Sequence, residues 1–192
     1  MPSALKLQAW SMLIEASKAC LLLVDVQDRL MPAMHQAERV ADNCVVLLKT
    51  AEKLDLPIII TEQYPKGLGP TIPELEHKGA MTFEKLSFSA MRDDAIRTHF
   101  KSMEDSGFKH VVMAGIEAHV CVLQTALDLK KAGFEVFVVA DAVSSRSAQS
   151  VELALARLGD NGVQIINVEM AIFELAGKAG TPEFKALSAL IK

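Results

Sequence analysis

The sequence lacks the features that mark several common protein classes. Its net charge of −4 at pH 7 argues against a general nucleic-acid binder, because binding to phosphates requires a basic face. No apolar run approaches the roughly 20 residues that span a bilayer, and the longest, Ala19 to Val24, has the length of a strand. The N-terminus lacks a charged head followed by a long apolar run and a cleavage site, so we expect no signal peptide and no membrane partner.

Cysteine is also scarce. The three cysteines, Cys20, Cys44 and Cys121, are odd in number and widely spaced, which does not suggest a disulfide framework. Neither CxxC nor HExxH occurs. We therefore expect a reducing cytoplasm as the simplest compartment, with Cys20 and Cys44 as core residues.

What is present suits one domain with a substantial core: 192 residues, of which 51% are hydrophobic and 23% charged. Continuous apolar runs predict buried strands, and apolar residues at helical spacing predict helices between them. The expected strands span residues 19–26, 57–61, 81–85, 111–114, 135–140 and 163–168. The expected helices span residues 38–54, about 89–106, 121 to about 133 and 144–158, followed by two short C-terminal helices.

This alternation predicts a three-layer α/β/α fold with a doubly wound, mostly parallel six-stranded sheet. Residues 18–192 are expected to form the single domain, and residues 1–17 an N-terminal extension or edge segment. Residues 62–79, rich in proline and glycine, are predicted to be a long ordered loop of the kind that often carries function. The loop after residue 140 offers Ser144 and Ser145 as caps for the next helix.

One cysteine lies where a predicted strand passes into a helix. The stretch from Gly115 to Thr125 reads GIEAHVCVLQT, and Cys121 is near the start of the helix. Ligand sites of open α/β sheets lie at the carboxyl ends of strands, and a helix N-terminus favours a thiolate. The alternative is that Cys121 is a small apolar residue of the core.

Two further strand ends carry unusual side chains. Asp25 ends the run LLLVDV, where an acid is costly to bury without a partner, and Lys85 ends the strand 81–85. Taken singly, Asp25 could be a cap and Lys85 a solvated lysine. Together with Cys121 they supply a base, a cation and a nucleophile at one sheet edge. We expect Lys85 to favour the Cys121 thiolate, Asp25 to accept the thiol proton, and backbone N–H groups to bind an oxyanion.

These motifs resemble the isochorismatase-like cysteine hydrolases, a superfamily that includes nicotinamidases and carbamoylsarcosine amidases. The resemblance covers roughly Lys18 to Lys192 and rests on LLLVDVQ, FEK and GIEAHVCV in that order. It implies a catalytic triad of Asp25, Lys85 and Cys121 and a thioester intermediate. It also implies a cis Ile116–Glu117 peptide that aims the N–H groups of Glu117 and Cys121 at the oxyanion, and it implies a homo-oligomer.

Within the superfamily, EQYPKGLG and DAVSSRS look most similar to the isochorismatase domain-containing proteins. Nicotinamidases hold a metal through an aspartate and histidines in the loop after the second strand. Here the only histidine of that loop is His77, so we expect no metal or other cofactor and doubt nicotinamide as the substrate. Because Cys121 is present, carbonyl chemistry is favoured over vinyl-ether cleavage.

The sequence therefore predicts a hydrolase that cleaves a small amide or related carbonyl compound. A binding or scaffold protein with a vestigial triad is the alternative. A flavodoxin-like cofactor binder is disfavoured because there is no GxGxxG loop.

Six residues are candidates for the substrate pocket, and several have a second interpretation. They are Gln27, Tyr64, Phe83, Phe88, Ile116 and His119. Gln27 either points into the cleft or is a loop residue, and Tyr64 is either a pocket wall or a loop anchor. A Cys121–His119 dyad is disfavoured, since the helix would turn His119 away. The Glu117 side chain is expected to point outward or to a neighbouring subunit, and Arg146 to reach either the site or an interface.

Overall fold

The computed structural model describes residues 13–191 and contains one six-stranded parallel sheet. The strand order is β3-β2-β1-β4-β5-β6. The strands are β1 (Ala19–Val24), β2 (Ile58–Gln63), β3 (Met81–Lys85), β4 (His110–Ile116), β5 (Glu135–Ser144) and β6 (Gln164–Ile166). The predicted sheet is confirmed, and every neighbouring pair runs parallel.

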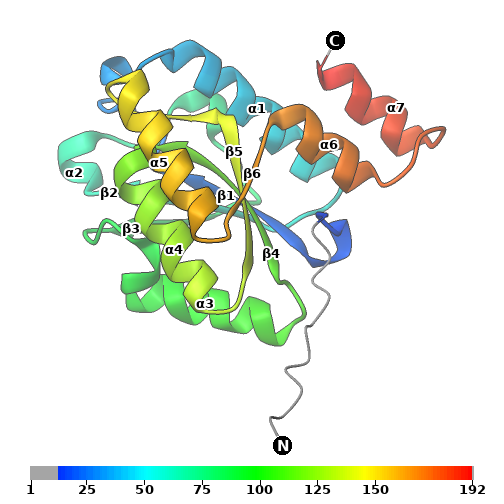
Figure 1. The fold of residues 1–192 in the computed structure, drawn as a ribbon, viewed down its shortest axis with the longest axis horizontal. Coiled ribbons are helices and arrows are strands. Elements are labelled where there is room, and N and C mark those ends of the chain that lie inside the picture. The colour runs from blue at the N-terminus through cyan, green and yellow to red at the C-terminus, as the bar shows by residue number, and fades with distance from the viewer. Residues whose placement is uncertain (1–12, 192) are drawn as a thin grey trace, which may run out of the picture.

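Helices cover both faces of this sheet, which confirms the three layers (Figure 1). Helices α1 and α6 lie on one face, with α7 beside them, and α3, α4 and α5 lie on the other. The helices are α1 (Ala37–Lys53), α2 (Pro65–Leu68), α3 (Asp94–Asp105), α4 (Leu123–Lys131), α5 (Ala148–Asp160), α6 (Val168–Ala176) and α7 (Pro182–Ser188). Short 3-10 turns span Ala16–Lys18, Met31–Ala33, Pro73–Leu75, Ala90–Arg92 and Ala189–Ile191.

The centre of the sheet explains the continuous apolar runs. All six residues of β1 and all seven of β4 are buried, because each strand is covered by helices on both faces. The chain builds outward from β1 to β3 and then returns to β4, so β1 and β4 meet at the point where the strand order reverses. Clefts for ligands form at such switch points, outside the carboxyl ends of the strands.

Some element boundaries differ from the predicted ones. The helix expected from about residue 89 begins at Asp94, because Asp93 accepts hydrogen bonds from the N–H groups of Ala95 and Ile96. The proposal that Ser144 and Ser145 cap the next helix is wrong. Strand β5 continues to Ser144, and Ser147 is the N-cap that accepts from the Ser150 N–H.

The long loop 62–79 and the N-terminal segment are both ordered where the structure describes them. The loop begins with the last residues of β2 and contains α2 and a 3-10 turn. The predicted segment 1–17 is described only from residue 13, and its described part forms no strand. There the Ile14 side chain is buried and the Glu15 N–H donates to His110 Nδ1 at 3.0 Å. Among residues 13–191, no helix is long and apolar enough to cross a membrane.

Candidate active site

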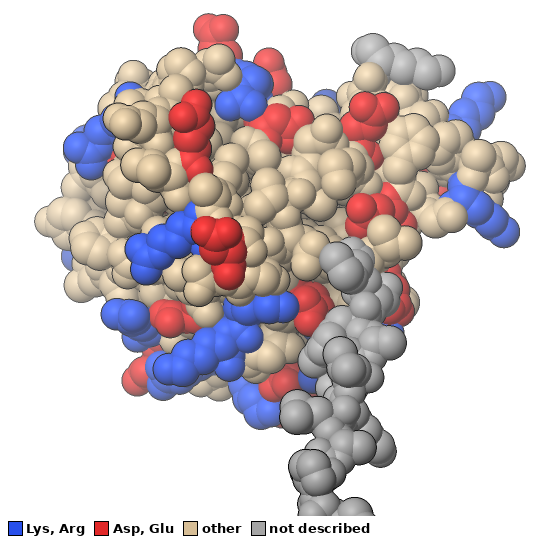
Figure 2. Space-filling model, in the orientation of Figure 1, with Lys and Arg blue, Asp and Glu red and all other residues tan. Residues whose placement is uncertain are grey.

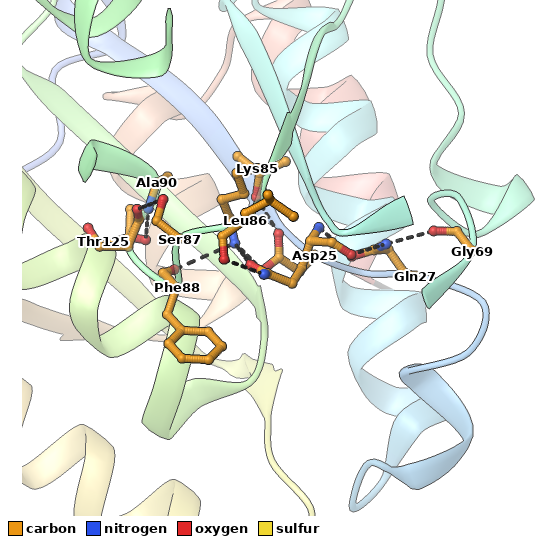
Figure 3. A network of polar contacts seen from close by, with 12 residues as sticks. Asp25, Gln27, Gly69, Lys85, Leu86, Ser87, Phe88, Ala90 and Thr125 are labelled. Carbon is orange, nitrogen blue, oxygen red and sulfur yellow. Dashed lines mark hydrogen bonds and ion pairs between the residues drawn. The ribbon is translucent and has the colours of Figure 1, made fainter. Parts of the chain in front are cut away.

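A fully buried ion pair joins the ends of β1 and β3. Lys85 Nζ lies 2.6 Å from Asp25 Oδ2, and both side chains are 0% exposed. Asp25 adopts a φ of 53°, an uncommon conformation for a residue with a side chain, directly after β1. Figure 3 shows the two side chains pointing toward one another from their separate strands. The prediction that these two strand ends meet is confirmed.

Each member of this pair has further partners that fix its position. Thr61 Oγ1 donates to the other carboxylate oxygen, Asp25 Oδ1, at 2.7 Å. Lys85 Nζ also donates to Gln63 Oε1 at 2.7 Å and to the Phe88 carbonyl at 3.5 Å. A buried ion pair is tolerated when its remaining hydrogen-bonding positions are satisfied in this way.

Thr61 and Gln63 were not foreseen from the sequence. They lie on β2, where Thr61 pairs with Val24 and Gln63 pairs with Lys85 in the sheet register. Their side chains reach the ion pair because β2 runs between β1 and β3. The register of a parallel pair has no local signal in the sequence, so only their position in the run IIITEQ could have suggested a role.

Cys121 lies in a widened helical turn between β4 and α4. Residues Ala118–Val122 form a π-helical turn, a local feature often found at functional sites, and Cys121 is 6% exposed. Gly115 brings β4 close to β1 just before this turn. Its φ is +117°, and a Cβ at this position would lie 2.1 Å from the Val24 carbonyl oxygen. Glycine is therefore required for the two strands to approach each other here.

The thiol of Cys121 is influenced by both members of the ion pair. Burial, and then the negative charge of Asp25, raise its pKa to about 12, while the positive charge of Lys85 lowers it by a smaller amount. Lys85 therefore acts in the expected direction, because its charge lowers the pKa of the thiol, but its effect is smaller than the combined effect of burial and Asp25. Burial of the thiol in the core cluster around α3, α4 and α5 outweighs the cation.

The pKa values of the Cys20 and Cys44 thiols are raised as that of Cys121 is, but the physical cause differs. Burial alone raises the pKa of each of these thiols to about 12. Both are core residues, as predicted. Cys121 is the thiol that charged groups surround.

The peptide bond between Ile116 and Glu117 is cis, as the resemblance implied. The N–H groups of Val120 and Val122 donate to the Glu117 carbonyl, which holds the turn that follows. The proposed oxyanion donors are the N–H group of Glu117, just before this turn, and that of Cys121, within it. Their role stays a prediction.

The Glu117 side chain is largely buried and pairs with an exposed arginine. Arg146 Nε lies 3.0 Å from Glu117 Oε2, and Arg146 Nη2 lies 3.1 Å from Glu117 Oε1. The Glu117 side chain is 10% exposed and that of Arg146 is 72% exposed. This bidentate contact raises the pKa of the Arg146 guanidinium. Of the two destinations left open for Arg146, the structure places it beside the turn of Cys121.

Two of the expected pocket residues, Gln27 and His119, form side-chain hydrogen bonds within the protein. Gln27 is buried, and its amide bonds the backbone of Gln63 in both directions and the Gly69 carbonyl at 2.6 Å. These contacts support its interpretation as a loop residue. His119 Nδ1 lies 2.9 Å from Ser145 Oγ, which leaves the proposed Cys–His dyad without support.

The remaining expected pocket residues lie in different places. Ile116 is fully buried in the core cluster that contains α1 and α6, and the Phe83 ring contacts the His99 ring in a tilted arrangement with centroids 5.3 Å apart. Tyr64 is 52% and Phe88 55% exposed, and the Phe88 ring points away from the polar network in Figure 3. A cavity of about 520 Å³ adjoins Lys85. Its lining consists of Tyr64, Pro65, Lys66, Glu84, Lys85, Leu86, Ser87, Arg92 and Asp93.

Within the described part of the chain, no three or more His, Cys, Asp or Glu residues are grouped so that they could hold a metal ion. The one histidine of the 62–79 loop, His77, contacts Glu52 with Nε2 and Oε1 3.0 Å apart. The local chemistry of the site is therefore that of a thiol, a carboxylate and an ammonium group.

Comparison with known proteins finds relatives that match most of the chain. The family model described as "Isochorismatase domain" matches residues 19–170. Isochorismatase domain-containing protein 2 of Danio rerio is 43% identical over 171 residues, which cover 89% of this chain and 85% of that protein.

Two solved structures share the fold closely. The structure named MAR1 ribonuclease from Caenorhabditis elegans is 35% identical, with a TM-score of 0.85 and coverage of 93% of this chain and 91% of that one. The YcaC gene product of Escherichia coli, described as an octameric hydrolase of unknown specificity, is 25% identical. Its TM-score is 0.86, and the match covers 93% of this chain and 90% of that one.

Proposed function

The chain belongs to the isochorismatase family, and from this premise and the geometry of the site we propose that it is a cysteine hydrolase of small amides or related carbonyl compounds. The observation that carries the proposal is the buried Asp25–Lys85 ion pair, whose two charges both act on the Cys121 thiol. A buried pair of this kind costs desolvation, and groups with strongly perturbed pKa values cluster at functional sites.

In the proposed acylation step, the Cys121 sulfur attacks the substrate carbonyl carbon while its proton moves to Asp25. The carbonyl electron pair moves to oxygen, and the N–H groups of Glu117 and Cys121 donate to that oxyanion. When the tetrahedral intermediate collapses, the C–N bond breaks and Asp25 returns the proton to the leaving amine. The product of this half-reaction is a thioester on Cys121.

In the second half-reaction, Asp25 takes a proton from a water molecule that attacks the thioester. The C–S bond then breaks, the acid product leaves, and Asp25 returns the proton to the sulfur, which restores the thiol of Cys121. Lys85 holds the carboxylate of Asp25 through the 2.6 Å contact. Thr61 keeps the other carboxylate oxygen in place, so that the carboxylate cannot rotate freely during the transfer.

The raised pKa of the Cys121 thiol is compatible with this order of events. A thiol with a pKa of about 12 is almost fully protonated at neutral pH, so the thiolate would form only as the proton moves to Asp25. General-base assistance of this kind activates nucleophiles whose free pKa is too high.

A screen of small amides, ureides and nicotinamide for ammonia release tests the proposal. We expect release with at least one amide and its loss in Cys121→Ala. Cys44→Ala is the matched control. Cys44 is also a buried thiol, but it lies on the core-facing side of α1 and is distant from Cys121 in the sequence. Full activity in Cys121→Ala on a confirmed substrate would overturn the mechanism. An absence of any acyl transfer to Cys121 would favour the vestigial binding protein.

RNA hydrolysis is a second candidate, because the Caenorhabditis elegans relative is named a ribonuclease. The charge distribution favours the amide hydrolase instead. Acidic and basic side chains are interspersed over the face drawn in Figure 2, and the net charge is −4. Binding to phosphates requires a basic surface. Incubation with single-stranded RNA, followed by gel electrophoresis of the RNA and with Cys121→Ala as the blank, distinguishes the two.

We extend the proposal to a homo-oligomer in the cytoplasm. The Escherichia coli relative is described as octameric, and Met170 and Phe173 on α6 are large apolar residues that are 45% and 47% exposed. All three thiols are free and buried, which suits a reducing compartment. Light scattering during gel filtration tests the assembly, and fractionation of cells tests the compartment.

A further inference from the structure

Glu117 brings a negative charge close to the place where the proposed reaction develops another one. Its backbone N–H is a proposed oxyanion donor, while its own carboxylate is 10% exposed and only a side chain away from that N–H. Like charges repel more strongly where water is scarce. An uncompensated carboxylate at this position would therefore oppose the oxyanion that the same residue is meant to stabilise.

Arg146 meets this carboxylate with the geometry that neutralises it most completely. Both carboxylate oxygens are engaged, at 3.0 and 3.1 Å, in the two-pronged contact that arginine forms with carboxylates. Ser145, which precedes Arg146, makes a second contact with the same region. Its Oγ lies 2.9 Å from His119 Nδ1. The loop between β5 and α5 thus contacts Glu117, the residue before the turn Ala118–Val122, through an ion pair, and His119 within that turn through a hydrogen bond.

We infer that Arg146 is a positioning residue of the active site, which cancels the charge of Glu117 and holds its carboxylate away from the oxyanion. The inference rests on the proposed function. A purely structural role predicts a small effect, because exposed ion pairs contribute little to stability and the Arg146 side chain is 72% exposed. An electrostatic role predicts a specific loss in reactions that form an oxyanion.

Two probes of Cys121 separate these roles. With 4-nitrophenyl acetate, the sulfur bonds to the carbonyl carbon through an oxyanion, and the C–O bond breaks with its electron pair leaving on 4-nitrophenolate. With iodoacetamide, the sulfur bonds to the methylene carbon and iodide leaves, so that no oxyanion forms. Both reactions use the same sulfur and require the loss of its proton, and therefore the ratio of their rates at one pH reduces the influence of any change in the acidity of the thiol. Mass spectrometry verifies that each adduct is on Cys121.

We expect Arg146→Met to lower the ratio of acetylation to alkylation about tenfold, less than the unscreened repulsion because water reaches the Arg146 side of the pair. Arg146→Lys keeps the charge and should stay within about threefold of the wild-type ratio. Arg97→Met is the matched control. It breaks an arginine–carboxylate contact of 2.6 Å with Asp94 on the surface of α3 and should leave the ratio unchanged.

The decisive variant combines Arg146→Met with Glu117→Gln. Removing the carboxylate removes the repulsion, so the double variant should recover the ratio that Arg146→Met loses. A ratio that is unchanged in Arg146→Met, or that falls and is not recovered in the double variant, would overturn the inference alone. If 4-nitrophenyl acetate left Cys121 of the wild-type protein unmodified, the proposed function would fail, and this inference with it.

Discussion

The candidate active site contains two ion pairs, which differ in their exposure to water and in the elements that hold them. The Asp25–Lys85 pair is 0% exposed on both sides, and further hydrogen bonds from β2 and from the loop after β3 hold it. The Glu117–Arg146 pair has one largely buried member and one that is 72% exposed. The first pair lies at the carboxyl ends of β1 and β3. The second pair joins the residue before a helical turn to the loop after β5.

The difference shows how one site can divide two tasks. A buried pair fixes the orientation of its members, because either charge left alone in the interior is strongly unfavourable. A pair open to water on one side contributes little to folding and can still set the local charge. We therefore expect changes to the first pair to affect both folding and chemistry, and changes to the second to affect chemistry almost alone.

The largest effect should come from Lys85→Met. It leaves the Asp25 carboxylate without its cation in the interior, and we expect the free energy of unfolding to fall by about 3–5 kcal/mol. Urea denaturation followed by circular dichroism measures this. Arg146→Met is the comparison and should unfold at nearly the wild-type urea concentration.

A second variant isolates the cause of the Lys85→Met loss. Combining Lys85→Met with Asp25→Asn removes the unpaired charge and should recover part of the lost stability. If Lys85→Met and Arg146→Met unfolded at the same urea concentration, the contrast between the two pairs would be wrong.

Thr61→Val should have the next largest effect. Valine has nearly the shape of threonine, so the change removes the hydrogen bond to Asp25 Oδ1 and little else. Hydrogen bonds to charged groups contribute about 1.5–3 kcal/mol, and we expect a loss of unfolding free energy of that size. Differential scanning calorimetry or urea denaturation measures it.

Thr50→Val is the control for this substitution. Thr50 is equally buried, but its hydroxyl donates to the Val46 carbonyl of its own helix, which lacks a charge. Its loss should be smaller than that of Thr61→Val. Equal losses would mean that Thr61 does not specifically support the ion pair.

The contrast between Thr61 and the three residues Asp25, Lys85 and Cys121 also shows what a sequence can and cannot predict. Asp25, Lys85 and Cys121 could be predicted together, because the carboxyl ends of parallel strands share one edge and an acid in LLLVDV is unusual. Thr61 and Gln63 could not, since their contacts depend on the register between β1, β2 and β3. The fold followed from periodicity, whereas the start of α5 did not, because β5 runs four residues beyond its predicted end at residue 140.

The net pKa shift of Cys121 could not be predicted from the sequence for a related reason. Lys85 and a helix start were visible in the sequence, but the depth of burial that outweighs them is a property of the packed helices. The direction of the Ile116 side chain, in contrast, could be examined from the sequence. Successive residues of a strand such as β4 face opposite sides of the sheet.

The buried pair should also control the reactivity of Cys121 with pH. Asp25 raises the pKa of the thiol above its ordinary value and Lys85 lowers it, so Asp25→Asn should lower this pKa below about 12. A lower pKa means more thiolate at pH 8, and a shift of one unit makes alkylation by iodoacetamide about tenfold faster. Lys85→Met should shift the profile to higher pH. Opposite shifts in these two variants are the expected result, and shifts in the same direction would contradict it.

The smallest effect should come from Gln63→Leu, at the boundary between the buried pair and the loop. Gln63 Oε1 accepts from Lys85 Nζ, while its amide nitrogen donates to the exposed Leu86 carbonyl at 2.8 Å. Gln63 is only partly buried, so water can take over part of its hydrogen bonding, and we expect a loss of about 0.5–1 kcal/mol of unfolding free energy. Gln27→Leu is the control and should cost more, because it strips partners from the backbone of Gln63 and Gly69 in a buried position. A loss in Gln63→Leu as large as that in Lys85→Met would show that the ion pair depends on its outer acceptor as much as on its own charges.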